Sequence, residues 1–320
     1  MAKPKIVVTR KLPDAVIQRA SRDYDATLNQ SDEVYSPDRL VALAAGKDGL
    51  LVAASDRLDS SLIERMPPSI RIAATFSVGY EHIDTAQAKK RGLVVTNTPD
   101  VLTDATADIT VALLLAAARR LGEGERIVRA GKWTGWTPTQ LLATQVTGKR
   151  LGIVGMGRIG RAVAKRARAF DMSVHYCNRT RLAPDLEAGA IFHATVEDML
   201  PVSDFLSLHC PATAETRHLL NAARIALLPK GAIVVNAARG AIIDDAALIA
   251  ALKSGHVAAA GLDVYDGEPR INPGYFAFEN AVLAPHLGSA TVETRNAMGF
   301  RALDNLDAFF AGRAPKDRVA

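Results

Sequence analysis

Three polar side chains follow apolar, strand-like runs in the last third of the sequence. Arg239 follows "AIVVNAA", Glu268 lies in "DVYDGEP", and His286 ends "AVLAPH". Because open parallel sheets bind ligands at the carboxyl ends of their strands, we expect these side chains at one site. An arginine can bind a carboxylate and polarise a ketone, and a protonated histidine can give its proton to the carbonyl oxygen as hydride arrives. A carboxylate orients that histidine and favours its charged form, so the set predicts reduction of a 2-oxo acid.

Each of these residues also has a simpler interpretation when it is taken alone. Arg239 could form a surface ion pair, Glu268 could be a turn residue before a proline, and His286 could end a strand. The prediction therefore depends on the combination of the three residue types at three strand ends.

A glycine-rich turn predicts where the hydride donor binds. The run "LGIVGMGRIG" places Gly155, Gly157 and Gly160 directly after a strand and at the start of a helix. In this context the first glycine permits the tight turn, the second lets the backbone approach a pyrophosphate, and the third allows close packing of helix and strand. The helix start offers unpaired N–H groups to the phosphates, and Arg158 could add a charge-assisted contact. The pattern predicts a dinucleotide site.

The stretch "HYCNRTR", from His175 to Arg181, indicates which dinucleotide is bound. NAD sites usually carry an acidic residue here, which binds the ribose hydroxyls and repels a 2′-phosphate. This chain has Asn178 instead, followed by Arg179 and Thr180, and Arg179 can pair with a 2′-phosphate while Thr180 and Arg181 donate further hydrogen bonds. We predict a preference for NADPH. Two alternatives stay open: the arginines are solvated loop cations, or the site accepts NADH as well.

The elements that must position these residues alternate between short apolar strands and helix-period segments. Such alternation is typical of an α/β fold with buried parallel sheets. The final segment "GSATVETRNAMGFRALDNLDAFFAG" reads as a helix, but its periodicity does not show which domain it joins. The strands are expected at 5–9, 49–54, 71–76, 92–97, 151–157, 173–177, 190–194, 205–210, 232–238, 258–264 and 281–286.

Composition narrows the class of protein. The 320 residues include 48% hydrophobic and 23% charged side chains, which fits a globular protein of two domains. The net charge of +5 is spread along the chain, so neither nucleic acid nor a membrane is expected as a partner. The apolar run 109–118 is too short to span a bilayer. The two cysteines, Cys177 and Cys210, show no metal-binding spacing or support for a disulfide, so no metal is expected and the cytoplasm is the expected compartment.

Several long motifs resemble one known family. The segments "NTPDVLTDATADITVALLLAAARR", "LGIVGMGRIGRAVAKRA", "LHCP", "VVNAARGAIIDDAALIAAL", "AGLDVYDGEP" and "APHLGSAT" look like the D-isomer-specific 2-hydroxyacid dehydrogenases. "SVGYEHID" and "GKWTGWTP" resemble the glyoxylate/hydroxypyruvate reductase branch of that family. The resemblance runs from about Phe76 to Thr294, and the first 70 residues match only in pattern.

The resemblance implies two Rossmann-like, doubly wound parallel-sheet domains. Residues 1–97 with 287–320 would form the substrate-binding lid domain, to which the C-terminal helix returns, and residues 98–286 would form the NAD(P)-binding domain. Hinges are expected near Thr98-Pro99 and just after His286. Arg239 matches the family's substrate-binding arginine, His286 its proton donor and Glu268 the carboxylate partner. Val78 and Gly79 match a lid loop whose backbone N–H groups receive the substrate carboxylate.

The resemblance also extends to the cofactor and to a second subunit. Asp263 matches the residue that binds the nicotinamide carboxamide, and Thr106 lies in a segment that touches the cofactor. The branch is usually a homodimer joined through the coenzyme domains, and Trp136 matches a tryptophan that reaches the neighbouring substrate pocket, although it could equally be a core or interface aromatic. Further cofactor contacts are expected at Ile159, Cys210, Pro211, Ala237 and Gly288.

The resemblance to this branch implies one expected function with two alternatives, whereas the spacing of the residues alone indicates only reduction of a 2-oxo acid. The expected function is NADPH-preferring reduction of glyoxylate to glycolate and of hydroxypyruvate to D-glycerate, with NADH as a possible second cofactor. The first alternative is a D-2-hydroxyacid dehydrogenase with a different 2-oxo acid substrate. The second is a non-catalytic, nucleotide-sensing binding protein of the same fold, which the complete set of Arg239, Glu268 and His286 disfavours.

Overall fold

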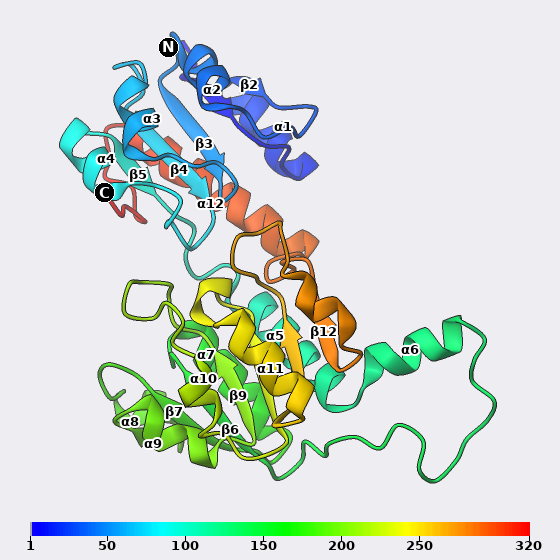
Figure 1. Ribbon diagram of the computed structural model, residues 1–320. Helices are drawn as coiled ribbons and strands as arrows, with labels where there is room; N and C mark the ends of the chain where they lie inside the picture. The colour runs from blue at the N-terminus through cyan, green and yellow to red at the C-terminus, as the bar shows by residue number, and fades with distance from the viewer. Residues whose placement is uncertain (1) are drawn as a thin grey trace. The chain divides into compact units, whose positions relative to one another are not determined.

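The computed structural model describes residues 2–320, which fold as two compact α/β units (Figure 1). Among these residues, unit 1 consists of 2–102 and Ala290–Ala320, and unit 2 of Thr103–Ser289. Both borders lie a few residues after the domain limits expected from the sequence. The assignment of substrate binding to one unit and coenzyme binding to the other stays a prediction.

Unit 1 is built on a five-stranded sheet in the order β2-β1-β3-β4-β5, with every neighbouring pair parallel. Its strands are β1 (Lys5–Val8), β2 (Asp25–Leu28), β3 (Gly49–Ala53), β4 (Ile72–Phe76) and β5 (Val94–Thr96). Its helices are α1 (Asp14–Asp23), α2 (Pro37–Ala44), α3 (Ser60–Arg65), α4 (Thr85–Arg91) and α12 (Val292–Phe310).

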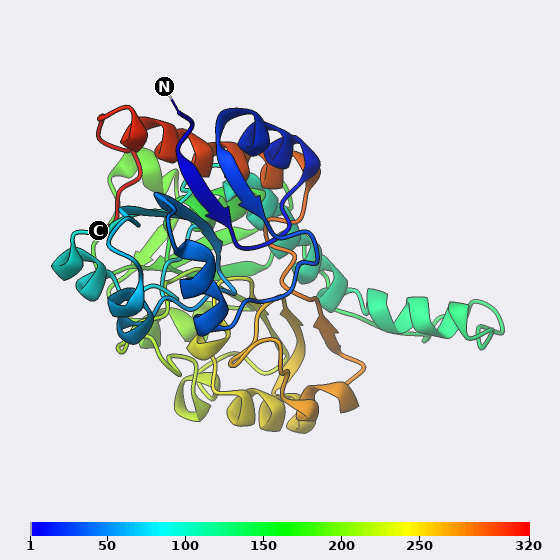
Figure 2. The same ribbon diagram turned by 90° about the horizontal axis from the view of Figure 1, so that it is seen from above.

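The inner strands of unit 1 are largely apolar because helices cover both faces of the sheet. Ile6, Val7 and Val8 on β1 are all fully buried, as a parallel sheet between two helical layers requires. The C-terminal helix α12 packs on β4 and runs beside α1, as Figure 2 shows. The implied return of this helix to the first domain is thus confirmed.

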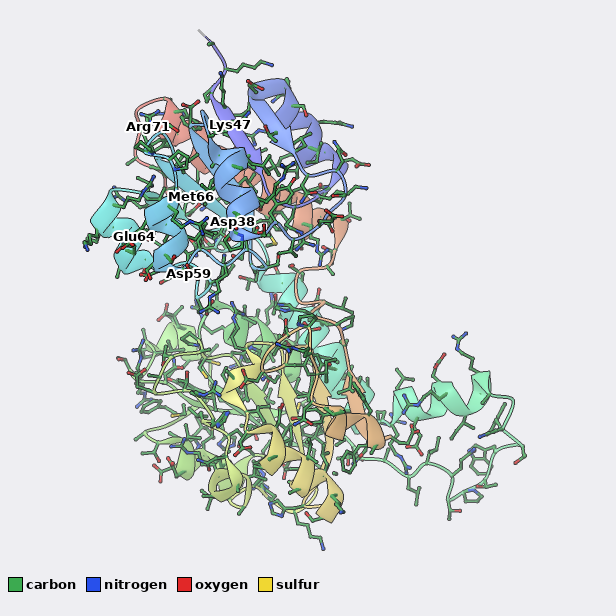
Figure 3. The ribbon with its side chains drawn as sticks, turned by 45° about the horizontal axis from the view of Figure 1, so that its top comes forward. Asp38, Lys47, Asp59, Glu64, Met66 and Arg71 are labelled. Atoms are coloured by element: carbon green, nitrogen blue, oxygen red, sulfur yellow. The ribbon has the colours of Figure 1, made fainter. Side chains whose placement is uncertain are left out.

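Side-chain contacts cap and connect the helices on the other face of this sheet. The carboxylate of Asp59 accepts a hydrogen bond from the N–H of Leu62 at 3.0 Å and so caps α3. Asp38, in the first turn of α2, forms an ion pair with Arg65 at the end of α3. Figure 3 labels Asp38 and Asp59, which lie at the starts of α2 and α3. Met66, which follows α3, is buried in the core of this face.

Unit 2 is built on a seven-stranded parallel sheet in the order β12-β11-β10-β9-β6-β7-β8. Its strands are β6 (Arg150–Val154), β7 (Ser173–Cys177), β8 (Ile191–His193), β9 (Phe205–Leu208), β10 (Ala232–Asn236), β11 (Val257–Leu262) and β12 (Ala281–Leu283). Its helices are α5 (Thr103–Ala118), α6 (Leu121–Arg129), α7 (Arg158–Arg168), α8 (Pro184–Glu187), α9 (Val196–Met199), α10 (Ala222–Ile225) and α11 (Asp245–Ser254), with short 3-10 turns at Leu200–Val202, Gly240–Ile242 and Pro273–Ala277.

The sheet of unit 2 separates two apolar cores because successive side chains of a strand point to opposite faces. On β10, Ile233 and Val235 belong to the core that α5 and α7 cover, whereas Val234 belongs to the core beneath α11. The strand order reverses between β6 and β9, and ligands of open α/β sheets bind at such a switch point. The α/β fold with two Rossmann-like units is confirmed.

The structure corrects three details of the expected elements. Strand β2 was not expected, because "DATL" is short and only partly buried at the sheet edge. Several expected strands end earlier, and the polar residues after them lie in loops. Residues Thr103 to Arg129, expected to be one long helical zone, are divided at Arg120, whose φ is 52°. Both views show α6 and the following chain projecting from the rest of unit 2 (Figures 1 and 2).

Two negative findings apply to residues 2–320. None of the helices in this range combines the length and the apolar character needed to cross a bilayer. The same part of the chain has no group of three or more His, Cys, Asp or Glu side chains arranged to hold a metal ion. Cys177 and Cys210 are both free, buried thiols.

Candidate active site

The three expected catalytic residues lie in loops that follow three strands at the same edge of the sheet of unit 2. Arg239 follows β10, Glu268 follows β11 and His286 follows β12. These strands are neighbours, and their last residues are in register, with Asn236 beside Leu262 and Leu262 beside Leu283. Parallel pairing therefore brings the three following loops to one place, as the sequence predicts.

The imidazole of His286 is held by a carboxylate. Its Nδ1 lies 2.7 Å from Oε2 of Glu268, and Oε1 of Glu268 accepts a hydrogen bond from the N–H of Tyr265 at 2.8 Å. The backbone of His286 has a left-handed φ of 55°, and its N–H donates to the carbonyl of Asp263 at 2.9 Å. The side chain is half exposed, so its other ring nitrogen, Nε2, can face a ligand.

The pKa values of this pair favour the charged forms. The hydrogen bond with Glu268 raises the pKa of His286 above its ordinary value, and burial opposes that shift without cancelling it. Burial also acts to raise the pKa of Glu268, but hydrogen bonds from His286 and from the Tyr265 N–H outweigh it and leave this pKa lowered. His286 therefore stays protonated to a higher pH than a free histidine does.

The turn that carries Arg239 is fixed by a buried asparagine. Asn236 donates from Nδ2 to the carbonyl of Arg239 at 2.9 Å, and its Oδ1 accepts from the N–H of Ala238 at 3.0 Å. The guanidinium donates from Nη1 to the Ala238 carbonyl at 2.7 Å. Its charge acts on the pKa values of both Glu268 and His286, which places the three groups within electrostatic reach of one another.

Gly240 lets the Arg239 turn touch the Glu268 turn. A Cβ at Gly240 would lie 1.8 Å from the carbonyl carbon of Tyr265 and 2.2 Å from the nitrogen of Asp266. No other residue type fits between these two backbones. The glycine after the arginine is thus a packing requirement that brings the substrate-binding candidate against the carboxylate.

Asp263 presents a buried oxygen without a protein partner. The side chain is fully buried at the end of β11, and its Oδ1 accepts from the N–H of Leu287 at 2.6 Å. Its Oδ2 is buried and has no hydrogen-bond partner in the described chain, and burial raises the pKa of the carboxyl. Buried acceptors of this kind usually have a partner, so this atom suits an N–H donor of a bound molecule, such as a carboxamide. Nearby, Thr106 donates to the carbonyl of Gly288 at 3.0 Å.

The glycine-rich turn has the shape that a dinucleotide requires. Gly155 has a φ of 94°, and a Cβ there would lie 2.6 Å from the nitrogen of Cys210. A Cβ at Gly160 would lie 2.5 Å from the carbonyl oxygen of Gly155. At Gly157 a Cβ would meet no atom within 4 Å, and no side chain caps the first N–H groups of α7, where Arg158 and Ile159 begin the helix. These residues fit a pyrophosphate at the helix start.

The loop after β7 differs in part from expectation. Oδ1 of Asn178 accepts from the N–H of Met156 at 2.6 Å and so holds the glycine-rich turn. Arg179 and Thr180 are exposed. Arg181, expected to donate to a phosphate, is instead bound by both oxygens of Glu187 at 2.8 and 3.1 Å.

The remaining expected residues lie at various places in the two units. Cys210 and Ala237 are buried just beyond β9 and β10, and Pro211 follows Cys210. Val78 and Gly79 lie in the loop after β4 of unit 1. The side chain of Trp136 is 78% exposed in the segment after α6, so in the described chain it is not a core aromatic.

Two supporting residues were not expected from the sequence. Asn236 fixes the Arg239 turn, and the backbone N–H of Tyr265 holds Glu268. A signal for Asn236 exists, because a polar residue that ends an otherwise apolar strand needs buried hydrogen-bond partners. A backbone donor leaves no trace in residue type, so the contact from Tyr265 is visible only in the structure.

Comparison with known proteins gives consistent results. The family described as "D-isomer specific 2-hydroxyacid dehydrogenase, NAD binding domain" matches residues 111–288. The chain is 43% identical to glycerate dehydrogenase of Hyphomicrobium methylovorum, covering 98% of each chain. It is also 43% identical to glyoxylate reductase of Thermococcus litoralis, over 99% of this chain and 97% of that one. A solved NADPH-dependent glyoxylate/hydroxypyruvate reductase of Sinorhizobium meliloti, in complex with NADP and malonate, has a TM-score of 0.90 at 36% identity, covering 100% of this chain and 97% of that chain.

Proposed function

The chain belongs to the D-isomer-specific 2-hydroxyacid dehydrogenase family, and on that premise we propose that it reduces glyoxylate to glycolate and hydroxypyruvate to D-glycerate with NADPH. Membership makes it an oxidoreductase with a nicotinamide cofactor that acts on 2-oxo acids. The observation that carries the proposal is the His286–Glu268 pair beside Arg239, at the sheet edge that also holds Asp263 and the glycine-rich turn.

The proposed mechanism assigns one task to each of these side chains. A bound nicotinamide would supply the hydride for the carbonyl carbon of the substrate. Arg239 binds the substrate carboxylate and draws electron density toward the ketone oxygen. His286 gives the Nε2 proton to that oxygen, so the carbonyl becomes a hydroxyl and the imidazole becomes neutral. Glu268 keeps the ring in position through Nδ1 and stabilises its charged form before transfer.

The residues of the cofactor site support this assignment. The unpartnered Oδ2 of Asp263 would accept from the nicotinamide carboxamide, and the open space at Gly157 would receive the pyrophosphate. Thr106, Ile159, Cys210, Pro211, Ala237 and Gly288 are proposed to line the same path across the sheet edge.

Small 2-oxo acids are proposed as substrates because one relative is named for glyoxylate, a small 2-oxo acid, and another for glycerate, the 2-hydroxy acid that reduction of hydroxypyruvate gives. Another 2-oxo acid remains the alternative within the same chemistry. The decisive assay follows the loss of NADPH absorbance with glyoxylate, with hydroxypyruvate and with a bulky aromatic 2-oxo acid, each repeated with NADH. Fast turnover of the two small acids supports the proposal. A preference for the aromatic acid would refute the substrate assignment, and binding of nucleotide without turnover would refute catalysis.

The preference for NADPH is proposed from the loop after β7. A carboxylate that would repel the 2′-phosphate is replaced by Asn178, and the exposed side chains of Arg179 and Thr180 follow it. The relative from Sinorhizobium meliloti is itself named as NADPH-dependent. NADH stays possible as a weaker second cofactor, because nothing in this loop excludes an unphosphorylated ribose.

Replacing Arg179 by Ala should raise the KM for NADPH about tenfold, because one charge-assisted contact with the phosphate is lost. The KM for NADH should stay the same, since NADH lacks the phosphate. Arg181→Ala is the matched control: this neighbouring arginine is bound by Glu187 and should change the NADPH-to-NADH ratio far less. An Arg179 variant with an unaltered NADPH KM would show that the phosphate binds elsewhere.

Replacing Glu268 by Gln should shift the pH profile of ketone reduction. Reduction needs protonated His286, so activity is present below the histidine pKa and declines as pH rises through it. The hydrogen bond with Glu268 raises that pKa, and Gln removes the negative charge, so the decline should move to lower pH. The measurement is kcat/KM as a function of pH, with Glu197→Gln, which removes a carboxylate paired with Arg224, as the control. Identical profiles for wild type and Glu268→Gln would refute the pairing.

A homodimer is proposed along with this function. Helix α6 has no buried residue, and its projecting segment exposes Leu121, Val128, Trp133 and Trp136. Apolar side chains that protrude in this way are typical of a surface that a second copy covers. Trp136 is proposed to reach the substrate pocket of that second copy. A cytoplasmic location is proposed because Cys177 and Cys210 are free thiols.

A further inference from the structure

The loop after β4 has three successive carbonyl groups that are held by hydrogen bonds. The carbonyl of Ser77 accepts from the N–H of Thr98 at 2.9 Å. The carbonyl of Val78 accepts from Nδ2 of Asn97 at 2.8 Å, and that of Gly79 accepts from the hydroxyl of Ser77 at 2.6 Å. Both outside donors come from the segment that follows β5, so this segment fixes the orientation of the loop peptides.

The opposite side of each peptide is thereby also fixed. In a trans peptide the N–H points away from the carbonyl of the preceding residue. The N–H groups of Val78, Gly79 and Tyr80 consequently face away from Thr98, Asn97 and the Ser77 hydroxyl. Within residues 2–320 these three N–H groups have no hydrogen-bond acceptor. Successive free N–H groups can bind an anion where a turn makes them converge.

Asn97 can hold the Val78 carbonyl because its own backbone is fixed on both sides. Its N–H donates to the carbonyl of Asp317 at 3.1 Å, and its carbonyl accepts from Nδ2 of Asn305 at 3.3 Å. Asn305 also donates to the Asp317 carboxylate at 3.0 Å. Arg301 binds that carboxylate through two nitrogens at 2.5 and 2.8 Å. The C-terminal segment thus fixes the buried Asn97, which in turn fixes the loop.

The Ser77 hydroxyl has support of its own. It lies 2.8 Å from the hydroxyl of Thr75, which lies 3.0 Å from Nε2 of His82. This chain of contacts holds the Gly79 carbonyl from within the loop. Asn97 differs because its side chain comes from another segment of the chain. It fixes the orientation of the central peptide of the three, which joins the Val78 carbonyl to the Gly79 N–H.

We propose that Asn97 is a positioning residue for the substrate carboxylate. By holding the Val78 carbonyl, it aims the Gly79 N–H at the carboxylate of the 2-oxo acid. The inference rests on the proposed function and on the role that the family resemblance implies for Val78 and Gly79, whose N–H groups would receive the substrate carboxylate together with Arg239. An asparagine is required because the contact needs an N–H donor: an aspartate of the same size would set a negative oxygen against the carbonyl and turn the peptide away.

The test compares Asn97→Ala and Asn97→Asp with the wild-type enzyme. Loss of the hydrogen bond frees one peptide, so the KM for glyoxylate should rise about tenfold in Asn97→Ala and further in Asn97→Asp. The kcat should change much less, and the dissociation constant of NADPH should stay the same. Oxalate, a carboxylate that is not reduced, should bind the NADPH-bound enzyme about tenfold more weakly, as measured by calorimetry.

Asn29→Ala is the matched control for a structural effect. Asn29 is buried in the same unit, and its Nδ2 also donates to two backbone carbonyls, those of Thr9 and Glu33, both at 2.7 Å. Equal effects of Asn29→Ala and Asn97→Ala on the KM and on oxalate binding, or no effect of Asn97→Asp on either, would overturn the inference. If wild-type enzyme reduced neither small acid, the proposed function would fail, and oxalate binding would still decide the role of Asn97.

Discussion

Replacement of His286 by Gln is expected to lower kcat for reduction of the 2-oxo acid by about a hundredfold to ten-thousandfold. Positioned general acids contribute about this much to a rate. Glutamine keeps a polar side chain at position 286 but cannot act as a general acid. The developing alkoxide would then have to take its proton from water. The dissociation constant of NADPH should stay close to that of the wild type, because His286 is assigned no contact with the phosphates.

The structure offers a control on the same sheet. His256 lies directly before β11, at the amino edge, and its Nε2 lies 2.9 Å from the carbonyl oxygen of Ile225. His256→Gln removes a histidine from the opposite edge and should leave kcat nearly unchanged. The residual activity of His286→Gln should also lose the decline that follows the histidine pKa. A loss of less than tenfold in kcat for His286→Gln would mean that another group supplies the proton.

Replacement of Gly240 by Ala is expected to destabilise unit 2 by more than about 4 kcal/mol, which is exceptional for one methyl group. The added Cβ would lie 1.8 Å from the carbonyl carbon of Tyr265, a backbone atom of the segment that continues the buried strand β11. Gly240 follows β10 and Tyr265 follows β11, two paired strands, so the clash is relieved only if one turn moves away from the other. The turns that carry Arg239 and Glu268 would separate, so activity should be lost together with stability.

Denaturant unfolding measures this effect directly. Gly124→Ala serves as the control, because a Cβ at that position in α6 would meet only a side-chain atom of Leu141, at 3.6 Å. Alanine favours a helix over glycine by about 1 kcal/mol, so this variant should be as stable as the wild type or slightly more stable. If Gly240→Ala unfolded at the same denaturant concentration as Gly124→Ala, the close contact of the two turns would be wrong.

The sequence alone indicated the fold and the edge that carries the chemistry. Continuous apolar runs such as "KIVV" and "AIVVN" can be buried only between two helical layers, which requires parallel strands. Parallel strands end at one edge, so polar residues after strands predicted that Arg239, Glu268 and His286 meet. The structure brings these residues to that edge, with β10, β11 and β12 as neighbours.

The local sequence pattern did not predict features that depend on a contact with another segment of the chain. Strand β2 pairs with β1 at the sheet edge although "DATL" carries little apolar signal. Arg181 was expected to face a phosphate, but it is bound by Glu187, which also accepts from the hydroxyl of Tyr176. A cation in a loop has many possible partners, and residue type does not say which one it finds.

Composition, periodicity and motif spacing thus determined the class of fold, the dinucleotide turn and the catalytic candidates, because each depends on residues close together in sequence or on a rule common to all parallel sheets. Only the tertiary structure decided that Gly240 must be a glycine, that one oxygen of Asp263 lacks a partner, and that Asn97 holds the Val78 carbonyl. These features depend on distances between atoms of segments that only the folded chain brings together. Such a distance cannot be worked out from the sequence of either segment alone.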